Sequence, residues 1–133
     1  MIVVDSSVLA VALVDDGADG ARARSRLRGE RLAAPAIIDL EVLSVLRGLV
    51  RSSQVTAARA QTAIEDLVAL PLRRAAHPAL LNRSWQLRHS LSAYDAAYVA
   101  LAEALEVPLV TGDGRLDRAT GPTCRIEVLD VSR

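Results

Sequence analysis

Four acidic residues stand where their side chains could gather and bind a divalent cation. Asp5 directly follows the first β-branched apolar run, and Asp113 comes three residues after a later apolar run, in a glycine-flanked turn. Glu41 and Asp95 each lie near the beginning of a segment with helical spacing. Because loops beyond the carboxyl ends of parallel strands converge, we expect these acids to meet at one edge of a sheet.

Carboxylates that are brought together repel one another unless a cation neutralises them. A set of oxygen ligands favours Mg²⁺ or Mn²⁺ over zinc, and the two histidines, His77 and His89, are too few for a histidine-based zinc site. Magnesium held by carboxylates takes further ligands from phosphate oxygens. The set therefore predicts hydrolysis of a phosphodiester.

Each acid also has a structural explanation. An aspartate between a strand and a helix is often only a helix cap, and one in a Gly-Asp-Gly turn can simply serve the turn. Asp95 follows Ser92 with capping-box spacing. Glu41 would ordinarily face solvent, and Asp39 offers a second carboxylate in the same segment. The order and spacing of the four acids together are what favour a metal site.

The elements that must position these acids alternate between strands and helices. Strands are expected at 2–4, 32–35, 71–74, 107–110 and 126–129, and helices at 8–13, 18–28, 37–46, 55–70, 78–91, 92–106 and 115–119. Such alternation requires crossover connections, which build a parallel sheet with helices on both faces. Trp85 is assigned to packing, and Tyr94 and Tyr98 to the core, with base stacking as the alternative.

The composition suits a single domain spanning residues 1–133. Hydrophobic residues make up 51% of the chain but aromatic residues only 2%, so the core must be aliphatic. The single Cys124 cannot form an internal disulfide, which favours a cytoplasmic location. No run approaches the roughly 20 apolar residues that span a bilayer.

The charges balance, with 16 basic and 16 acidic residues, so nucleic-acid contacts must be local. Every basic residue is arginine, which excludes mechanisms that need a P-loop or Schiff-base lysine. The main basic cluster lies between residues 22 and 31, where Arg22 and Arg26 share a helical face. These two side chains either contact RNA phosphates or form a solvated helix face.

Four stretches of the sequence together resemble the PIN domains, and among them the VapC-type toxins of bacterial type II toxin–antitoxin pairs. The stretches are Val4-Asp5-Ser6-Ser7-Val8-Leu9, residues 36–41, Ser92-Ala93-Tyr94-Asp95-Ala96-Ala97-Tyr98-Val99-Ala100-Leu101-Ala102, and Leu109-Val110-Thr111-Gly112-Asp113. The likeness covers essentially the full length, and the third stretch is the most specific.

The resemblance implies an α/β fold, a single PIN-like domain whose parallel sheet of about five strands is flanked by helices. It places Asp5, Glu41, Asp95 and Asp113 at the family's four acidic positions. Members cleave RNA with Mg²⁺ or Mn²⁺, usually as homodimers, and are inhibited by a cognate VapB-like antitoxin. Ser7 and Thr111 match positions that orient carboxylates or water, whereas Ser44 departs from the Asn of many relatives. Asp117 either joins the acids or is a solvated helix residue.

Our hypothesis is that Asp5, Asp95 and Asp113 hold the ion directly or through water, while Glu41 positions or deprotonates the attacking water. The number of ions, one or two, is left open. Two rival functions are a PIN-fold binding module without activity and a metal-dependent phosphatase of small phosphoesters. The first would be favoured by a missing acid, and the second by an enclosed pocket with cations that grip phosphate.

Overall fold

The structure, a computed structural model, describes residues 1–131 and alternates between strands and helices as the sequence predicts. The strands are β1 (Ile2–Val4), β2 (Leu32–Pro35), β3 (Leu72–Ala75), β4 (Leu109–Thr111) and β5 (Ile126–Val128). The helices are α1 (Ser6–Val14), α2 (Ala18–Leu27), α3 (Ile38–Arg51), α4 (Ala57–Ala69), α5 (Leu81–Gln86), α6 (Ala93–Leu105) and α7 (Gly114–Arg118), with a 3₁₀ turn η1 (Pro78–Leu80).

All the strands lie parallel, in the order β3-β2-β1-β4-β5. In the central register, Val3 of β1 lies between Ala33 of β2 and Leu109 of β4. From β1 the chain builds outward through β2 to β3, and it returns on the other side as β4 and β5. The loops after β1 and β4 therefore diverge at a topological switch point, which is where an open parallel sheet binds its ligands.

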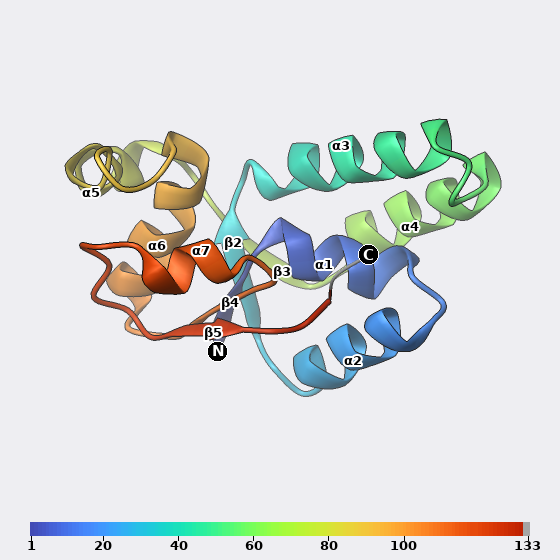
Figure 1. Ribbon diagram of the computed structural model, residues 1–133, viewed down its shortest axis with the longest axis horizontal. Helices are drawn as coiled ribbons and strands as arrows, with labels where there is room; N and C mark the ends of the chain where they lie inside the picture. Colours follow the sequence, from blue (N-terminus) through green and yellow to red (C-terminus); the bar gives the residue numbers. More distant parts are fainter. Residues whose placement is uncertain (132–133) are drawn as a thin grey trace.

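Helices cover both faces of the sheet (Figure 1). Helix α1 packs on α2, α3 and α4, and α3 packs on α4, while α6 packs on β1, β2, β4 and α5. Right-handed crossovers explain this division, because connections that run in opposite directions along the sheet lie on opposite faces. The predicted α/β fold is confirmed.

Aliphatic side chains fill the core, as the composition requires. Val3, Val4, Val110 and Ile38 are fully buried, and each such side chain stabilises the fold by about 1.5–3 kcal/mol. Tyr98 is the largest fully buried side chain in the described residues. No helix within residues 1–131 is long and apolar enough to cross a membrane.

Three local predictions are wrong. The segment 78–91 is not one helix, because η1 is followed by the short α5, which ends at Gln86. Trp85 does not pack in the core: it is 67% exposed, and the Arg88 guanidinium lies over its ring, 4.4 Å from the centroid. Tyr94 is likewise exposed, whereas Tyr98 lies in the core as predicted.

Candidate metal centre

Asp5 lies at the junction of β1 and α1, at the centre of the switch point. It occupies the N-cap position of α1, yet its side chain makes no capping hydrogen bond. Its Oδ2 instead accepts hydrogen bonds from Ser7 Oγ at 2.8 Å and Thr111 Oγ1 at 2.7 Å. The residue is only 7% exposed. Two hydroxyl groups thus hold this carboxylate in an orientation in which it does not cap the helix.

The same hydroxyl groups join the loop after β1 to the loop after β4. Ser7 Oγ accepts from the backbone N–H of Gly112 at 2.9 Å, and Thr111 Oγ1 accepts from that of Asp113 at 3.0 Å. A Cβ at Gly112 would lie 2.8 Å from Val131 Cγ2 and 3.3 Å from Ser7 Oγ, so a larger residue here would force these side chains to shift. This network holds Asp5 and the Asp113 backbone in one rigid unit.

Glu41 lies in the first turn of α3 and reaches toward α6. The buried hydroxyl of Tyr98 donates to its Oε1 at 2.6 Å. Burial raises the pKa of Glu41, the hydrogen bond from Tyr98 opposes that rise, and the charges of Asp5 and Asp95 add to it. The Asp39 carboxylate instead forms an ion pair with Arg74 of β3, with 2.8 Å between Asp39 Oδ2 and Arg74 Nε. Of these two acids, Glu41 is therefore the one that faces the other site carboxylates.

Asp95 lies in the first turn of α6, which Ser92 caps by accepting the Asp95 N–H at 3.1 Å. Burial raises the pKa of Asp95, and the charges of Asp5 and Asp113 raise it further, against the opposing effect of Arg115. Like charges with these effects on one another must lie near the same point. Asp95 therefore links Asp5 and Glu41 on one side to Asp113 on the other.

Asp113 caps α7, and its carboxylate is engaged by Arg115. Its Oδ1 accepts the Arg115 backbone N–H at 2.9 Å, while the guanidinium Nη2 donates to Oδ2 at 2.6 Å. Hydrogen bonds from the Arg115 side chain lower the pKa of Asp113. Asp113 thus serves the turn and carries an ion pair in this structure.

The four acids share an electrostatic field without forming a ligand shell. No group of three or more His, Cys, Asp or Glu side chains within residues 1–131 is placed so that it could hold a metal ion. The donors nevertheless fit a hard divalent cation, because they are all carboxylates. Burial raises the pKa of Glu41 and Asp95, and repulsion from the neighbouring carboxylates raises it further. A bound cation would relieve that repulsion. For Asp113 to bind the cation, its ion pair with Arg115 would have to break.

We expect Asp95→Asn to stabilise the metal-free protein. A carboxyl group whose pKa is raised by folding stabilises the protein at acidic pH, and this contribution is lost as pH rises through the folded pKa. At pH 7 the variant should therefore melt higher than the wild type, by about 2 °C. Thermal unfolding of both proteins in EDTA at pH 7 and pH 4 measures this difference in melting temperature. The difference should be smaller at pH 4 than at pH 7. An equal or lower melting temperature at pH 7 would contradict the proposed repulsion.

Among the described residues, no hydrogen bond or ion pair joins the four acids to Arg22, Arg26 or Asp117. Arg26 donates to both oxygens of Glu127 on β5, and Arg22 donates to Asp19 and to the backbone oxygen of Asp130. These pairs hold α2 to the C-terminal part of the described chain, and an RNA contact by either arginine stays a prediction. Asp117 is exposed in the first turn of α7, and its membership in the site also stays a prediction.

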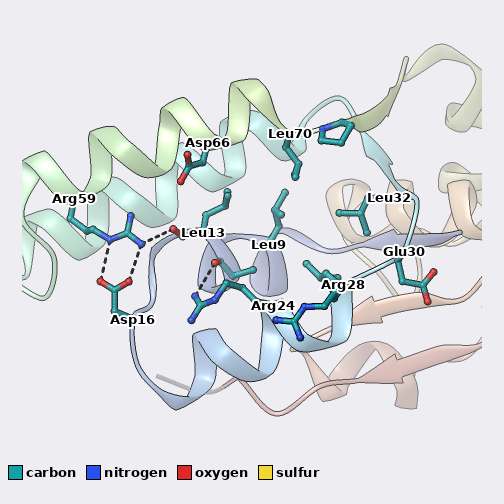
Figure 2. Close-up of a pocket in the computed structure, with 13 residues that line it drawn as sticks. Leu9, Leu13, Asp16, Arg24, Arg28, Glu30, Leu32, Arg59, Asp66 and Leu70 are labelled. Carbon is teal, nitrogen blue, oxygen red and sulfur yellow. Dashed lines mark hydrogen bonds and ion pairs between the residues drawn. The ribbon is translucent and has the colours of Figure 1, made fainter.

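A cavity between the helices lies away from the four acids (Figure 2). It has a volume of about 610 Å³ between α1, α2 and α4, with Leu9 and Leu13 among its apolar lining residues. Arg59 at its rim donates to both oxygens of Asp16 and to the backbone oxygen of Leu13. None of the four acids lines this cavity, so it does not supply the enclosed phosphoester pocket that a phosphatase would need.

Two contacts of the site were missed at the level of sequence. Tyr98 was assigned only to packing or stacking, although its position three residues after Asp95 puts both on one face of α6. Arg115 was noted only as the start of a short helix, although a cation two residues after an acid was a readable signal. Both contacts depend on side-chain direction, which spacing alone does not give.

Comparisons with known proteins agree with this architecture. Residues 2–122 match the PIN domain family. The chain is 41% identical over 128 residues to Ribonuclease VapC1 of Mycobacterium tuberculosis, covering 96% of each chain. It is 42% identical over 129 residues to VapC ribonuclease Mb0985 of Mycobacterium bovis, covering 97% of this chain and 98% of that one.

Solved structures share the fold at low sequence identity. FitAcB from Neisseria gonorrhoeae matches with a TM-score of 0.71 and 16% identity, covering 96% of each chain. VapC20 of Mycobacterium tuberculosis, described as a toxin that cleaves the sarcin-ricin loop, matches with a TM-score of 0.65 and 19% identity, covering 89% of this chain and 94% of that one. The PIN-type fold predicted from the sequence is therefore confirmed.

Proposed function

This chain belongs to the PIN domain family, and on that premise we propose that it is a metal-dependent endoribonuclease, the toxin of a type II toxin–antitoxin pair. Its relatives at about 40% identity are named ribonucleases and match it over nearly their whole length. The substrate is RNA, and the bond that is hydrolysed is a phosphodiester.

One observation carries the proposal: Asp5 is buried at the switch point and held by two hydroxyl groups in place of capping its helix. Holding a charged group in this way is costly unless the charge has a partner. The raised pKa values of Glu41 and Asp95 support the same conclusion, because burial and the charges of neighbouring carboxylates disfavour both anions without a bound cation. The catalytic acids that we propose are Asp5, Glu41, Asp95 and Asp113.

The four acids divide between two roles in the proposal. Asp5, Asp95 and Asp113 hold Mg²⁺ or Mn²⁺, and Glu41 positions or deprotonates the water that attacks phosphorus. When bound, the ion neutralises charge on the phosphate and lowers the pKa of water. Ser7 and Thr111 keep Asp5 oriented, and Tyr98 keeps Glu41 oriented. Burial and the nearby carboxylates raise the pKa of Glu41, which brings this group closer to the range of a general base.

The proposed reaction is tested by incubating the purified protein with RNA, with Mg²⁺, with Mn²⁺ and with excess EDTA. We expect cleavage with either ion, none with EDTA, and recovery when Mn²⁺ is restored. A parallel incubation with p-nitrophenyl phosphate tests the phosphatase alternative. Cleavage that persists in EDTA would contradict the metal dependence, and hydrolysis of the small ester without RNA cleavage would favour the phosphatase.

We propose two partners, a VapB-like antitoxin and a second copy of this chain. An exposed apolar surface over α3 and α5 suits the second copy, because Leu40 is 60%, Leu81 60% and Trp85 67% exposed. We expect light scattering to give the mass of a dimer and Leu40→Asp to give a monomer. A wild-type protein that is monomeric at micromolar concentration would contradict the homodimer.

A further inference from the structure

Arg115 is the one cation that is in contact with the acid site in the described part of the chain. Among residues 1–131, no other basic side chain forms an ion pair with Asp5, Glu41, Asp95 or Asp113. Its guanidinium binds the Asp113 carboxylate through Nε, 3.1 Å from each oxygen, and through Nη2, 2.6 Å from Oδ2. The hydrogen bond with Asp113 raises the pKa of Arg115, and the charge of Asp95 adds to this rise.

This ion pair occupies the carboxylate that the proposed metal site needs. The Asp113 side chain is 27% exposed and the Arg115 side chain 78% exposed, so the arginine lies on the solvent side of the pair. Arg115 is therefore able to turn away without disturbing the core. The cap of α7 does not depend on the guanidinium, because the backbone N–H at position 115 donates to Asp113 Oδ1 independently.

We propose that Arg115 exchanges partners when the site is loaded: it neutralises Asp113 in the metal-free protein and binds an RNA phosphate once a divalent ion takes that carboxylate. This inference rests on the proposed nuclease function. A guanidinium pairs with a phosphate in the same two-pronged geometry as with a carboxylate, so the exchange conserves its hydrogen bonds. The release also places a cation beside the reacting phosphate, whereas Arg22 and Arg26 on α2 are already paired within the chain.

Mn²⁺ affinity tests the first half of the exchange. Calorimetric titration without RNA should show Arg115→Gln binding Mn²⁺ about two- to fivefold more tightly than the wild type, as expected for losing one exposed competing ion pair. Arg118→Gln is the matched control, because Arg118 is on the same helix and contributes its charge near Asp113 without bonding to it. An unchanged affinity in Arg115→Gln, or an equal gain in Arg118→Gln, would overturn the exchange.

RNA cleavage kinetics at saturating Mn²⁺ test the second half. Arg115→Gln should raise KM for RNA severalfold, and Arg115→Lys, which keeps the charge, should recover part of the loss. A KM equal to that of the wild type would overturn phosphate binding by Arg115. A wild-type protein that binds Mn²⁺ but cleaves no RNA would refute the proposed function, while the calorimetric comparison would still decide the exchange at Asp113.

Discussion

Asp5→Asn should lower metal-dependent RNA cleavage by about 10³-fold while the protein stays folded. Asparagine keeps an oxygen that can accept from Ser7 and Thr111, so the hydrogen bonds that fix position 5 are retained. It loses the negative charge that the proposed ion requires. Initial cleavage rates at saturating Mg²⁺, together with thermal unfolding, measure the two effects separately.

The stability of this variant should equal or slightly exceed that of the wild type without metal, because the Asp5 charge raises the pKa of both Glu41 and Asp95. Addition of Mn²⁺ should raise the melting temperature of the wild type but not of the variant. Glu65→Gln is a suitable control, since it removes an exposed carboxylate from α4. If Asp5→Asn were destabilised but still cleaved RNA, the result would contradict a catalytic role for Asp5 and indicate a structural one.

The fold could be predicted because its determinants are local. Ile2-Val3-Val4 ends at an aspartate that begins a helix, and Ser92 with its downstream acid marks the beginning of α6. Alternation of such segments leaves few arrangements other than a parallel sheet covered by helices. The four acids were candidates for the same reason, since each follows a strand end or lies near the beginning of a helix at that edge of the sheet, and their roles in the site stay a prediction.

The contacts of the site could be predicted less well, because they join residues that are far apart in the chain. The Tyr98 hydroxyl meets Glu41 across 57 positions, and the Thr111 hydroxyl meets Asp5 across 106. Spacing on one helix says which residues share a face but not which partner that face meets. The choice between Asp39 and Glu41 likewise needed the structure, because Arg74 on the neighbouring strand decides it.

Tyr98→Phe should lower kcat about tenfold to a hundredfold, the usual cost of losing a group that orients a metal-site residue. Tyr98 is 1% exposed, and its hydroxyl is the donor that holds Glu41. Phenylalanine fills the same space, so the core stays packed, and only the hydrogen bond is lost. Because the Glu41 carboxylate then lacks this donor, the free energy of unfolding should also fall by about 1–3 kcal/mol.

The pH dependence separates this role from simple destabilisation. Burial raises the pKa of Glu41 and the Tyr98 hydrogen bond lowers it, so losing the hydroxyl must raise that pKa further. Glu41 ionises at higher pH in the variant, and the acid limb of the kcat profile should move to higher pH. Tyr94→Phe removes a hydroxyl from the exposed side of the same helix and should leave the profile in place. A lower kcat with an unmoved acid limb would mean that Tyr98 supports the fold without acting on Glu41.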